Sequence, residues 1–123
     1  MKTILVVDDF PNTRKVIEFT LKKLNSVELI FAEDGRDALR YFDGRPISML
    51  ITDYNMPNMD GAELTKEVRK LRDYECIPIL MLTTETSEDK KQKAKELGVT
   101  AWMKKPFVAE SFFSFVEKCI NAA

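Results

Sequence analysis

Five short runs of mostly large apolar residues constrain the fold of this chain more than any other feature. They span residues 4–7, 29–32, 49–52, 79–82 and 101–103. Continuous apolar runs are typical of parallel strands that are covered on both faces, because neither face then needs to be polar. Between the runs, apolar residues recur at intervals of three and four, which is the spacing of amphipathic helices. Five alternations of strand and helix predict an α/β fold with a doubly wound parallel sheet and helices on both of its faces.

The expected helices have recognisable ends. Their starts are expected at Asn12 as a cap, at Asp34 or Gly35, near Ala62, after Ser87 and after Pro106. Gly44 and Gly98 stand where the second and fourth helices should end, since glycine readily adopts the left-handed conformation that follows a helix. We expect the first helix to bury Val16 and the third to bury Leu71 on their apolar stripes.

Length and composition are those of an ordinary globular domain. With 123 residues, 45% of them hydrophobic and 32% charged, the chain is expected to form one domain over 1–123, with its own core and no output domain. Its 19 basic and 20 acidic side chains leave a net charge of −1, which gives no reason to expect nucleic acid or a membrane surface as a partner. The lysines between residues 90 and 95 are expected on a solvated helix face.

Two absences narrow the chemistry. There is no histidine, so a Ser-His triad, a histidine base and an imidazole-ligated metal site are excluded. Cys76 and Cys119 lack the spacing of metal ligands and are expected to be reduced thiols. We expect no signal peptide, and no apolar run in the sequence is long enough to cross a bilayer. We therefore expect a cytoplasmic protein.

Carboxylates follow two of the expected strands. Asp8 and Asp9 end the first, and Asp53 ends the third. If these strands are neighbours, the three carboxylates converge outside the carboxyl ends of the strands, where parallel sheets bind ligands. Like charges so close are unfavourable unless a cation bridges them, and oxygen ligands favour a hard ion such as Mg²⁺. The alternative is that Asp8 and Asp9 only begin a solvated loop.

Asp53 has a position that suits a nucleophile. A carboxylate can attack phosphorus and form an acyl phosphate, and Asp53 stands between a buried strand and a loop that contains Pro57 and Gly61. The same residues are typical of a turn, so the alternative is an aspartate that only helps to form that turn.

Two further strand ends carry groups that suit phosphoryl transfer. Thr83 ends the fourth strand, and Lys105 follows the fifth. A phosphoryl group in transfer spreads its charge over three equatorial oxygens, so catalysis depends on positioning and electrostatic stabilisation. Lys105 and the Thr83 hydroxyl could each meet one of these oxygens. Considered alone, Lys105 fits a surface lysine better, and Thr83 fits an ordinary strand residue.

A resemblance emerges when the strand ends are taken together: they carry Asp8, Asp9, Asp53, Thr83 and Lys105. This set, over the whole chain, resembles the receiver domains of two-component response regulators. The segment Asp-Tyr-Asn-Met-Pro-Asn-Met-Asp-Gly, which begins at Asp53, is close to the chemotaxis-type pattern of that family. The resemblance implies a flavodoxin-like receiver fold, with five strands in the order 2-1-3-4-5 and five helices.

For the chemistry, the resemblance implies a signalling switch that is not a turnover enzyme but catalyses its own phosphorylation and dephosphorylation. Asp53 would accept a phosphoryl group from a phosphohistidine of a histidine kinase or a histidine phosphotransfer protein. Lys105 would contact that group, and its bond to the following proline would be cis. Mg²⁺ would be the cofactor, held directly by Asp9 and Asp53, by the backbone carbonyl of Asn55, and by Asp8 through water.

For signalling, the resemblance implies that Thr83 turns its hydroxyl toward the phosphoryl group. Trp102 stands at the position of the family's switch aromatic and would move inward with Thr83. The alternative is a Trp102 that stays packed over the fourth helix, since an indole needs more room than the usual Tyr or Phe. The surface of the fourth helix, fifth strand and last helix would bind a target protein, with the flagellar motor switch as one candidate. Asn55 and Glu85 match positions that influence loss of the phosphoryl group, and a monomer is expected.

Other functions stay open. A receiver that relays phosphoryl groups between proteins fits the same residues. An aspartate-nucleophile phosphatase of the haloacid dehalogenase type also uses a strand-end Asp, a Thr or Ser, and a Lys. That superfamily carries a second Asp two residues after the nucleophile, however, where this chain has Asn55. A binding module that has lost the chemistry is disfavoured by the complete set of site residues.

Overall fold

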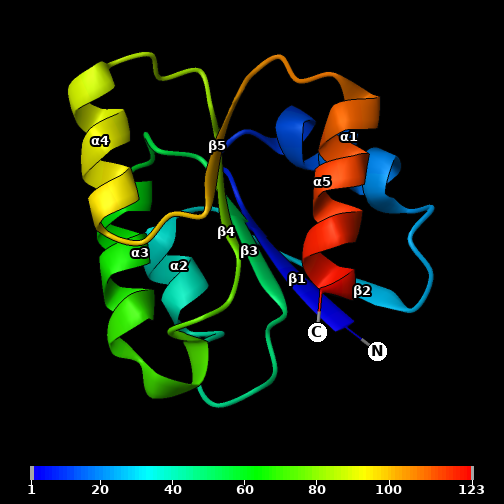
Figure 1. Cartoon of the computed structure of the whole chain (residues 1–123), viewed down its shortest axis with the longest axis horizontal. Helices are drawn as coiled ribbons and strands as arrows, with labels where there is room; N and C mark the ends of the chain where they lie inside the picture. The colour runs from blue at the N-terminus through cyan, green and yellow to red at the C-terminus, as the bar shows by residue number, and fades with distance from the viewer. Residues whose placement is uncertain (1, 123) are drawn as a thin grey trace.

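The computed structural model describes residues 2–122 and shows a parallel sheet of five strands between two layers of helices (Figure 1). The strands are β1 (Lys2–Val7), β2 (Val27–Ala32), β3 (Met49–Thr52), β4 (Ile79–Thr83) and β5 (Ala101–Lys104). Their order in the sheet is β2-β1-β3-β4-β5, and each neighbouring pair is parallel. The α/β class, the doubly wound sheet and the expected strand order are therefore confirmed.

Helices cover both faces of the sheet. They are α1 (Pro11–Leu21), α2 (Gly35–Leu39), α3 (Gly61–Lys70), α4 (Glu88–Glu96) and α5 (Ala109–Asn121), with a short 3-10 helix η1 (Arg72–Tyr74) after α3. α1 and α5 lie on one face, and α2, α3 and α4 lie on the other (Figure 1). Right-handed crossovers between parallel strands produce this arrangement, which brings the carboxyl ends of all the strands to one edge of the sheet.

β1 shows why the apolar runs lack polar alternation. Successive side chains of a strand point to opposite faces, and here both faces are buried. Ile4 and Val6 belong to the core that α1 and α5 complete around Phe112. Leu5 and Val7 belong to the core that α2 and α3 complete. All four strand residues are at most 1% exposed, so an apolar side chain is required at each of them.

Two expectations about α1 are wrong. Asn12 does not cap the helix, which begins at Pro11 and has no side-chain capping hydrogen bond. Proline suits the first helical position, because its fixed φ is already helical and its missing N–H would have no partner there. The expected burial of Val16 is also wrong, since Val16 is 52% exposed. The helix is buried only through the narrower stripe of Ile17 and Leu21.

The ends of α2 and α3 also differ from expectation. α2 ends at Leu39, and Gly44, with a φ of 105°, lies beyond it in a turn. Leu71 is 37% exposed rather than buried, because it caps the end of α3 in an extended conformation and leaves the helical stripe. The starts of α2 and α4 agree with expectation better than the helix ends do. Asp34 and Ser87 cap these two helices through side-chain hydrogen bonds.

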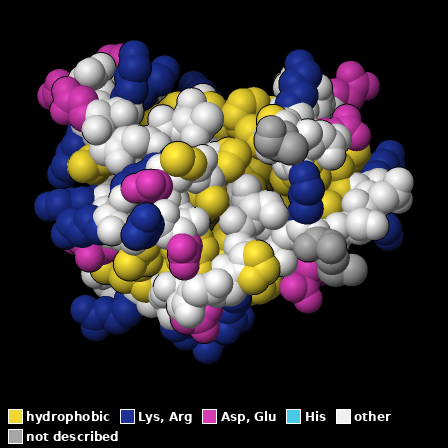
Figure 2. Space-filling view, turned by 60° about the horizontal axis from the view of Figure 1, so that its bottom comes forward, with side chains coloured by type: hydrophobic (Ala, Val, Ile, Leu, Met, Phe, Trp, Pro, Cys, Tyr) yellow, Lys and Arg dark blue, Asp and Glu magenta, His cyan; other side chains and the backbone are white. Residues whose placement is uncertain are grey.

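The surface carries mixed charge. Figure 2 shows the molecule from the lower end of Figure 1, where Lys and Arg side chains are interspersed with Asp and Glu, with hydrophobic side chains between them. This mixing agrees with the net charge of −1 and gives the visible face no field of a single sign. Within residues 2–122, no helix is both long and apolar enough to cross a membrane.

The sheet register aligns the strand ends that carry polar groups. Val7 and Thr52 are register partners, so the two aspartates that directly follow them come side by side. The backbone N–H of Lys105 donates to the carbonyl oxygen of Thr83 at 2.9 Å. Residues from four separate parts of the sequence are thereby held at one edge of the sheet.

Candidate functional site

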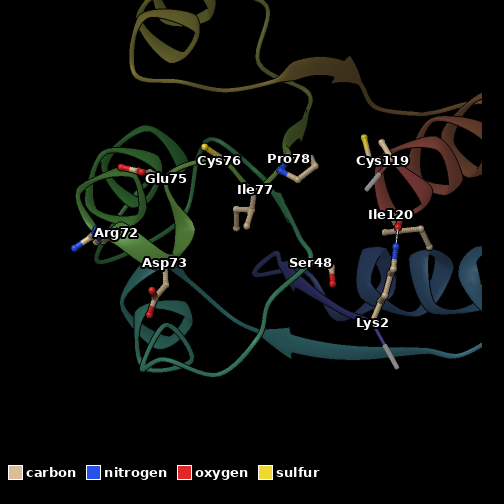
Figure 3. A pocket seen from close by; sticks show the side chains of 11 residues that line it. Lys2, Ser48, Arg72, Asp73, Glu75, Cys76, Ile77, Pro78, Cys119 and Ile120 are labelled. Carbon is tan, nitrogen blue, oxygen red and sulfur yellow. Dashed lines mark hydrogen bonds between the residues drawn. The ribbon is translucent and has the colours of Figure 1, made fainter.

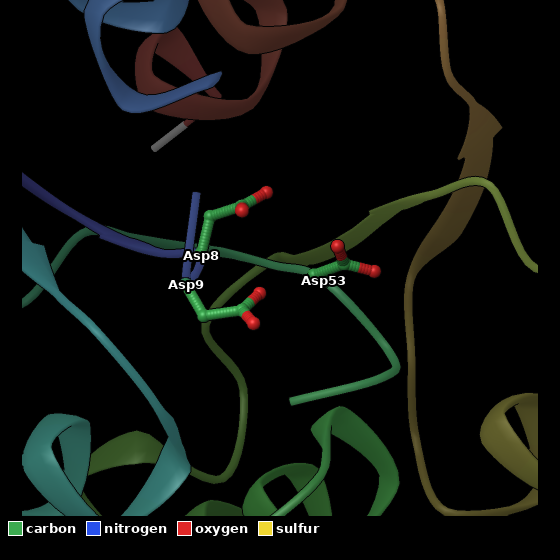
Figure 4. Close-up of side chains that lie close together, drawn as sticks. All are labelled: Asp8, Asp9 and Asp53. Carbon is green, nitrogen blue, oxygen red and sulfur yellow. The ribbon is translucent and has the colours of Figure 1, made fainter. Parts of the chain in front are cut away.

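Three carboxylates meet at the carboxyl edge of the sheet. Asp8 and Asp9 extend from the end of β1 and Asp53 from the end of β3, and their side chains point into the same space (Figure 4). One carboxylate oxygen from each lies within 4.8 Å of the others. Asp8 and Asp53 are buried, with 2% and 6% of their surface exposed, and Asp9 is half-buried. The expected convergence is confirmed, while the chemical role of each residue stays a prediction.

Lys105 reaches this cluster from the end of β5. Its ammonium lies 2.6 Å from Oδ2 of Asp8 and 2.8 Å from Oδ2 of Asp53, and its side chain is only 12% exposed. The bond between Lys105 and Pro106 is cis, as the resemblance implies. Burial acts to lower the pKa of Lys105, but the hydrogen bonds to Asp53 and Asp8 outweigh it and raise that pKa above its ordinary value. The amine is therefore a fixed cation, and the interpretation of Lys105 as a surface lysine is wrong.

Keeping the buried carboxylates of this cluster ionised costs free energy. Burial raises the pKa of Asp8 above its ordinary value, and the nearby charge of Asp53 adds to that shift. Hydrogen bonds from Lys105 and from the backbone N–H of Phe10 oppose the shift without cancelling it. With three carboxylates against one ammonium, the ionised cluster keeps an excess of two negative charges.

One oxygen of the cluster has no partner. Oδ1 of Asp9 is buried and accepts no hydrogen bond from any of residues 2–122. Leaving a buried acceptor unsatisfied costs free energy, so a divalent cation would satisfy this oxygen and neutralise the excess charge together. A set of carboxylate and carbonyl oxygens is the kind of donor set that Mg²⁺ takes.

The loop after Asp53 folds back closely on the strand end. The N–H of Tyr54 donates to Oδ1 of Asp53 at 2.6 Å and fixes that carboxylate. The N–H of Gly61 donates to the carbonyl oxygen of Tyr54 at 2.7 Å, and a Cβ on Gly61 would clash with the carbonyl oxygen of Asp53. Glycine is required here because two backbone segments approach closely. Asp53 thus begins a turn and also presents its carboxylate, so the two interpretations of this residue are compatible.

Thr83 and Asn55 are joined through Glu85. Thr83 is fully buried, and its hydroxyl accepts a hydrogen bond from the N–H of Glu85 at 3.2 Å. The side-chain amide of Asn55 donates to Oε1 of Glu85 at 2.9 Å. The hydrogen bond from Asn55, followed by those from the N–H of Ser87 and the ammonium of Lys90, lowers the pKa of Glu85 to about 2. Glu85 is therefore ionised at neutral pH.

Trp102 is half-buried on β5 and contacts the loop after Asp53. Its ring centroid lies 5.9 Å from that of Tyr54, with a tilt of 50°. Ala94 of α4 and Met81 of β4 belong to the same cluster. Sequence reasoning overlooked Tyr54, since an aromatic residue after a strand-end aspartate does not reveal what its ring contacts. The pairing of Lys90 with Glu85 was also missed, because basic residues on a helix are usually solvated.

A separate cavity of about 360 Å³ lies at the opposite edge of the sheet (Figure 3). Lys2 and Pro78, at the amino ends of β1 and β4, help to line it together with both cysteines. The ammonium of Lys2 donates to the carbonyl oxygen of Ile120. Burial raises the pKa of Cys119, which keeps this thiol protonated and weakly reactive, and Cys76 is exposed. The cavity shares no residue with the carboxylate cluster.

Comparison with known proteins identifies a family for this chain. Residues 4–117 match the response regulator receiver domain family. The chain belongs to this family. As a receiver domain it is similar to the chemotaxis protein CheY of Pseudomonas aeruginosa, with 36% identity over 115 residues, 94% of this chain and 93% of that protein. The suspected family is therefore confirmed.

Solved structures of receiver domains give the same result. The chemotaxis response regulator CheY4 of Vibrio cholerae is 40% identical and superimposes with a TM-score of 0.87, covering 97% of this chain and 98% of that one. The receiver domain of the sensor histidine kinase PA1611 from Pseudomonas aeruginosa is 25% identical, with a TM-score of 0.87 and 98% of both chains covered. That receiver domain is described with a magnesium ion coordinated in its active site cleft.

Proposed function

We propose that this chain is a phosphorylation-dependent signalling switch that accepts a phosphoryl group on Asp53. The donor would be a phosphohistidine of a histidine kinase or a histidine phosphotransfer protein. The observation that carries the proposal is the position of Lys105 between Asp8 and Asp53, beside the unpartnered oxygen of Asp9. A held nucleophile, a fixed cation and an acidic pocket are the parts that phosphoryl transfer to a carboxylate needs.

The two oxygens of Asp53 have different partners. Oδ1 is held by the N–H of Tyr54, whereas Oδ2 faces the ammonium of Lys105. In the transfer, one oxygen of Asp53 bonds to phosphorus while the bond from phosphorus to the donor imidazole breaks, and the imidazole leaves with the electron pair. The charge that the carboxylate loses goes to the leaving imidazole, which takes up a proton, while Lys105, oriented by Asp8, stays close to the phosphoryl oxygens and stabilises their negative charge. The chain thereby promotes its own phosphorylation without turning over a separate substrate.

The donor set of the cluster fits Mg²⁺. Asp9 and Asp53 would hold the ion directly, Asn55 through its backbone carbonyl, and Asp8 through water. When bound, Mg²⁺ neutralises charge on the phosphoryl oxygens. Two observations support this assignment: Oδ1 of Asp9 is buried without a donor, and burial, with a smaller contribution from Asp53, raises the pKa of Asp8. A bound cation would relieve both costs.

Thr83 and Trp102 are proposed to carry the signal to a target protein. The Thr83 hydroxyl accepts from Glu85 and can still donate its own proton to a phosphoryl oxygen. The surface of α4, β5 and α5 would then change and bind the target. Relatives named as chemotaxis proteins support a target in motility control, with the flagellar motor switch as the first candidate. We propose that the protein acts as a cytoplasmic monomer, and a phosphorelay role would use the same chemistry.

Incubation with acetyl phosphate and Mg²⁺, followed by intact-mass measurement, tests the proposed function. The protein should gain one phosphoryl group, and both Asp53→Asn and removal of Mg²⁺ by a chelator should prevent the gain. Asp73→Asn, at an exposed aspartate of η1, is the matched control and should be labelled normally. Undiminished Mg²⁺-dependent labelling of Asp53→Asn would overturn the assignment. Sustained turnover of a generic phosphomonoester would instead favour a phosphatase.

A further inference from the structure

The carboxylate of Glu85 is held by donors from three parts of the chain. Oε1 accepts from the side-chain amide of Asn55 at 2.9 Å and from the ammonium of Lys90 at 3.1 Å. Oε2 accepts from the backbone N–H groups of Thr86 at 3.2 Å and Ser87 at 3.0 Å. The Glu85 side chain is only 16% exposed in this position. Both oxygens are therefore fixed, and the carboxylate joins the loop after Asp53 to the start of α4.

Lys90 occupies an unusual place for a lysine. It lies in the first turn of α4, where its N–H donates to the capping hydroxyl of Ser87 at 3.3 Å. A cation at a helix amino end is unfavourable to the helix dipole, so helix stability does not account for it. Its ammonium instead pairs with Glu85 and lies 5.4 Å from the ring centroid of Tyr54. In the described part of the chain, the neighbouring Lys91 forms no such ion pair.

We propose that Lys90 is a positioning residue for phosphorylation of Asp53, acting through the carboxylate of Glu85. Lys90 holds this carboxylate against Asn55, which follows Asp53 by two residues, and neutralises its charge. Without Lys90, an unneutralised carboxylate borders a site that must admit an anionic phosphodonor, and repulsion slows the reaction. This inference rests on the proposed function, since it concerns the rate of phosphorylation at Asp53.

The proposal is tested by the initial rate of phosphorylation by acetyl phosphate in saturating Mg²⁺. Intact-mass measurement follows this rate. Lys90→Met should slow the reaction about threefold, the size expected when one partly exposed ion pair is lost. Lys90→Arg should retain the rate of the unaltered chain, because a guanidinium can keep the charge and donate to the same oxygen. Lys91→Met removes the same charge from the same helix without touching Glu85, and it should leave the rate unchanged. Thermal unfolding of each variant confirms that it is folded.

The Glu85→Gln background shows whether Lys90 acts through Glu85. With a neutral amide at residue 85, adding Lys90→Met should cause no further slowing. The side-chain amide resonances of Asn55 should shift in Lys90→Met and not in Lys91→Met, which reports the lost contact independently of the rate. Three results would overturn this proposal alone. Lys90→Met and Lys91→Met could slow the reaction equally, the Lys90→Met effect could persist in Glu85→Gln, or Lys90→Met could leave the rate unchanged. An unaltered chain that takes no phosphoryl group at Asp53 would overturn the proposed function as well.

Discussion

The ammonium of Lys105 lies 2.8 Å from Oδ2 of Asp53, although 52 positions separate the two residues in the sequence. The same ammonium contacts Asp8, which is 97 positions away. Both contacts depend on the fold, because β1, β3 and β5 bring Asp8, Asp53 and Lys105 to one edge of the sheet. The fold therefore places a cation beside Asp53, the proposed phosphoacceptor.

Lys105→Met should lower the free energy of unfolding by about 3 kcal/mol at pH 7 without divalent cations, because it leaves Asp8 and Asp53 buried together and unpaired. The pKa of Asp8, already raised by burial, would then rise further above its value in the unfolded protein, because the opposing hydrogen bond from Lys105 is lost. Such a group stabilises the fold at low pH and loses that contribution as pH rises, so the deficit should shrink on acidification. Urea denaturation in a chelator at several pH values measures this, with the exposed Lys104→Met as control. A deficit that is equally large below pH 4.5 would contradict the account.

Asp8→Asn should stabilise the protein when no divalent cation is present. Burial raises the pKa of Asp8, so its ionised form is disfavoured in the folded state, and its contribution to stability falls as pH rises through that raised value. Asn removes this penalty, so we expect the variant to have a larger free energy of unfolding than the original chain at pH 7. The gain should vanish below the ordinary carboxyl pKa. Added Mg²⁺ should stabilise the original chain more than the variant, and the opposite order would count against an Asp8 role at the cation site.

Gly61→Ala should destabilise the protein more than Gly44→Ala. Alanine at residue 61 would gain up to about 1 kcal/mol in helix propensity, but its Cβ clashes with the carbonyl oxygen of Asp53, and overpacking against backbone costs about 3 kcal/mol. Gly44 has a φ of 105° and open space around it, so alanine there costs only about 1 kcal/mol of backbone strain. Chemical denaturation of both variants gives the comparison. Equal losses would mean that the loop can move away from β3.

The elements with the most regular patterns were predictable from the sequence. β1 could be recognised because both of its faces are buried, which forces an unbroken apolar run. The convergence of Asp8, Asp9 and Asp53 followed from strand order alone, since parallel strands end at the same edge. Errors occurred where neighbours in space decide the outcome. Val16 fits the helical stripe of α1, but the sheet reaches only the narrower face beside it.

The contacts of Glu85 could not be predicted from the sequence. Asn55 lies thirty positions before Glu85, and Lys90 five positions after it. Neither spacing corresponds to a helical or strand repeat, because both pairings depend on how two loops approach each other. The clash that requires glycine at residue 61 could not be predicted either, because in the sequence Gly61 resembles an ordinary turn residue. Local patterns therefore identified the site residues, and packing between loops determined how they are held.

Trp102 should report phosphorylation through its fluorescence, and it is the only tryptophan of the chain. Its half-buried ring rests against Tyr54, so inward movement would change both its solvent exposure and that contact. Beryllofluoride with Mg²⁺, as a phosphoryl analogue, should shift the emission in the original chain and not in Asp53→Asn. An unchanged spectrum under demonstrated analogue binding would mean that the indole stays packed over α4.

Reduction with borohydride tests most directly whether Asp53 itself carries the phosphoryl group. Borohydride reduces an acyl phosphate to the corresponding alcohol, so treatment of the phosphorylated protein should convert one aspartate into homoserine. Peptide mass mapping should find homoserine at residue 53, only when both acetyl phosphate and Mg²⁺ are present. Homoserine at residue 8 or 9, or a labelled protein with residue 53 unchanged, would contradict the account.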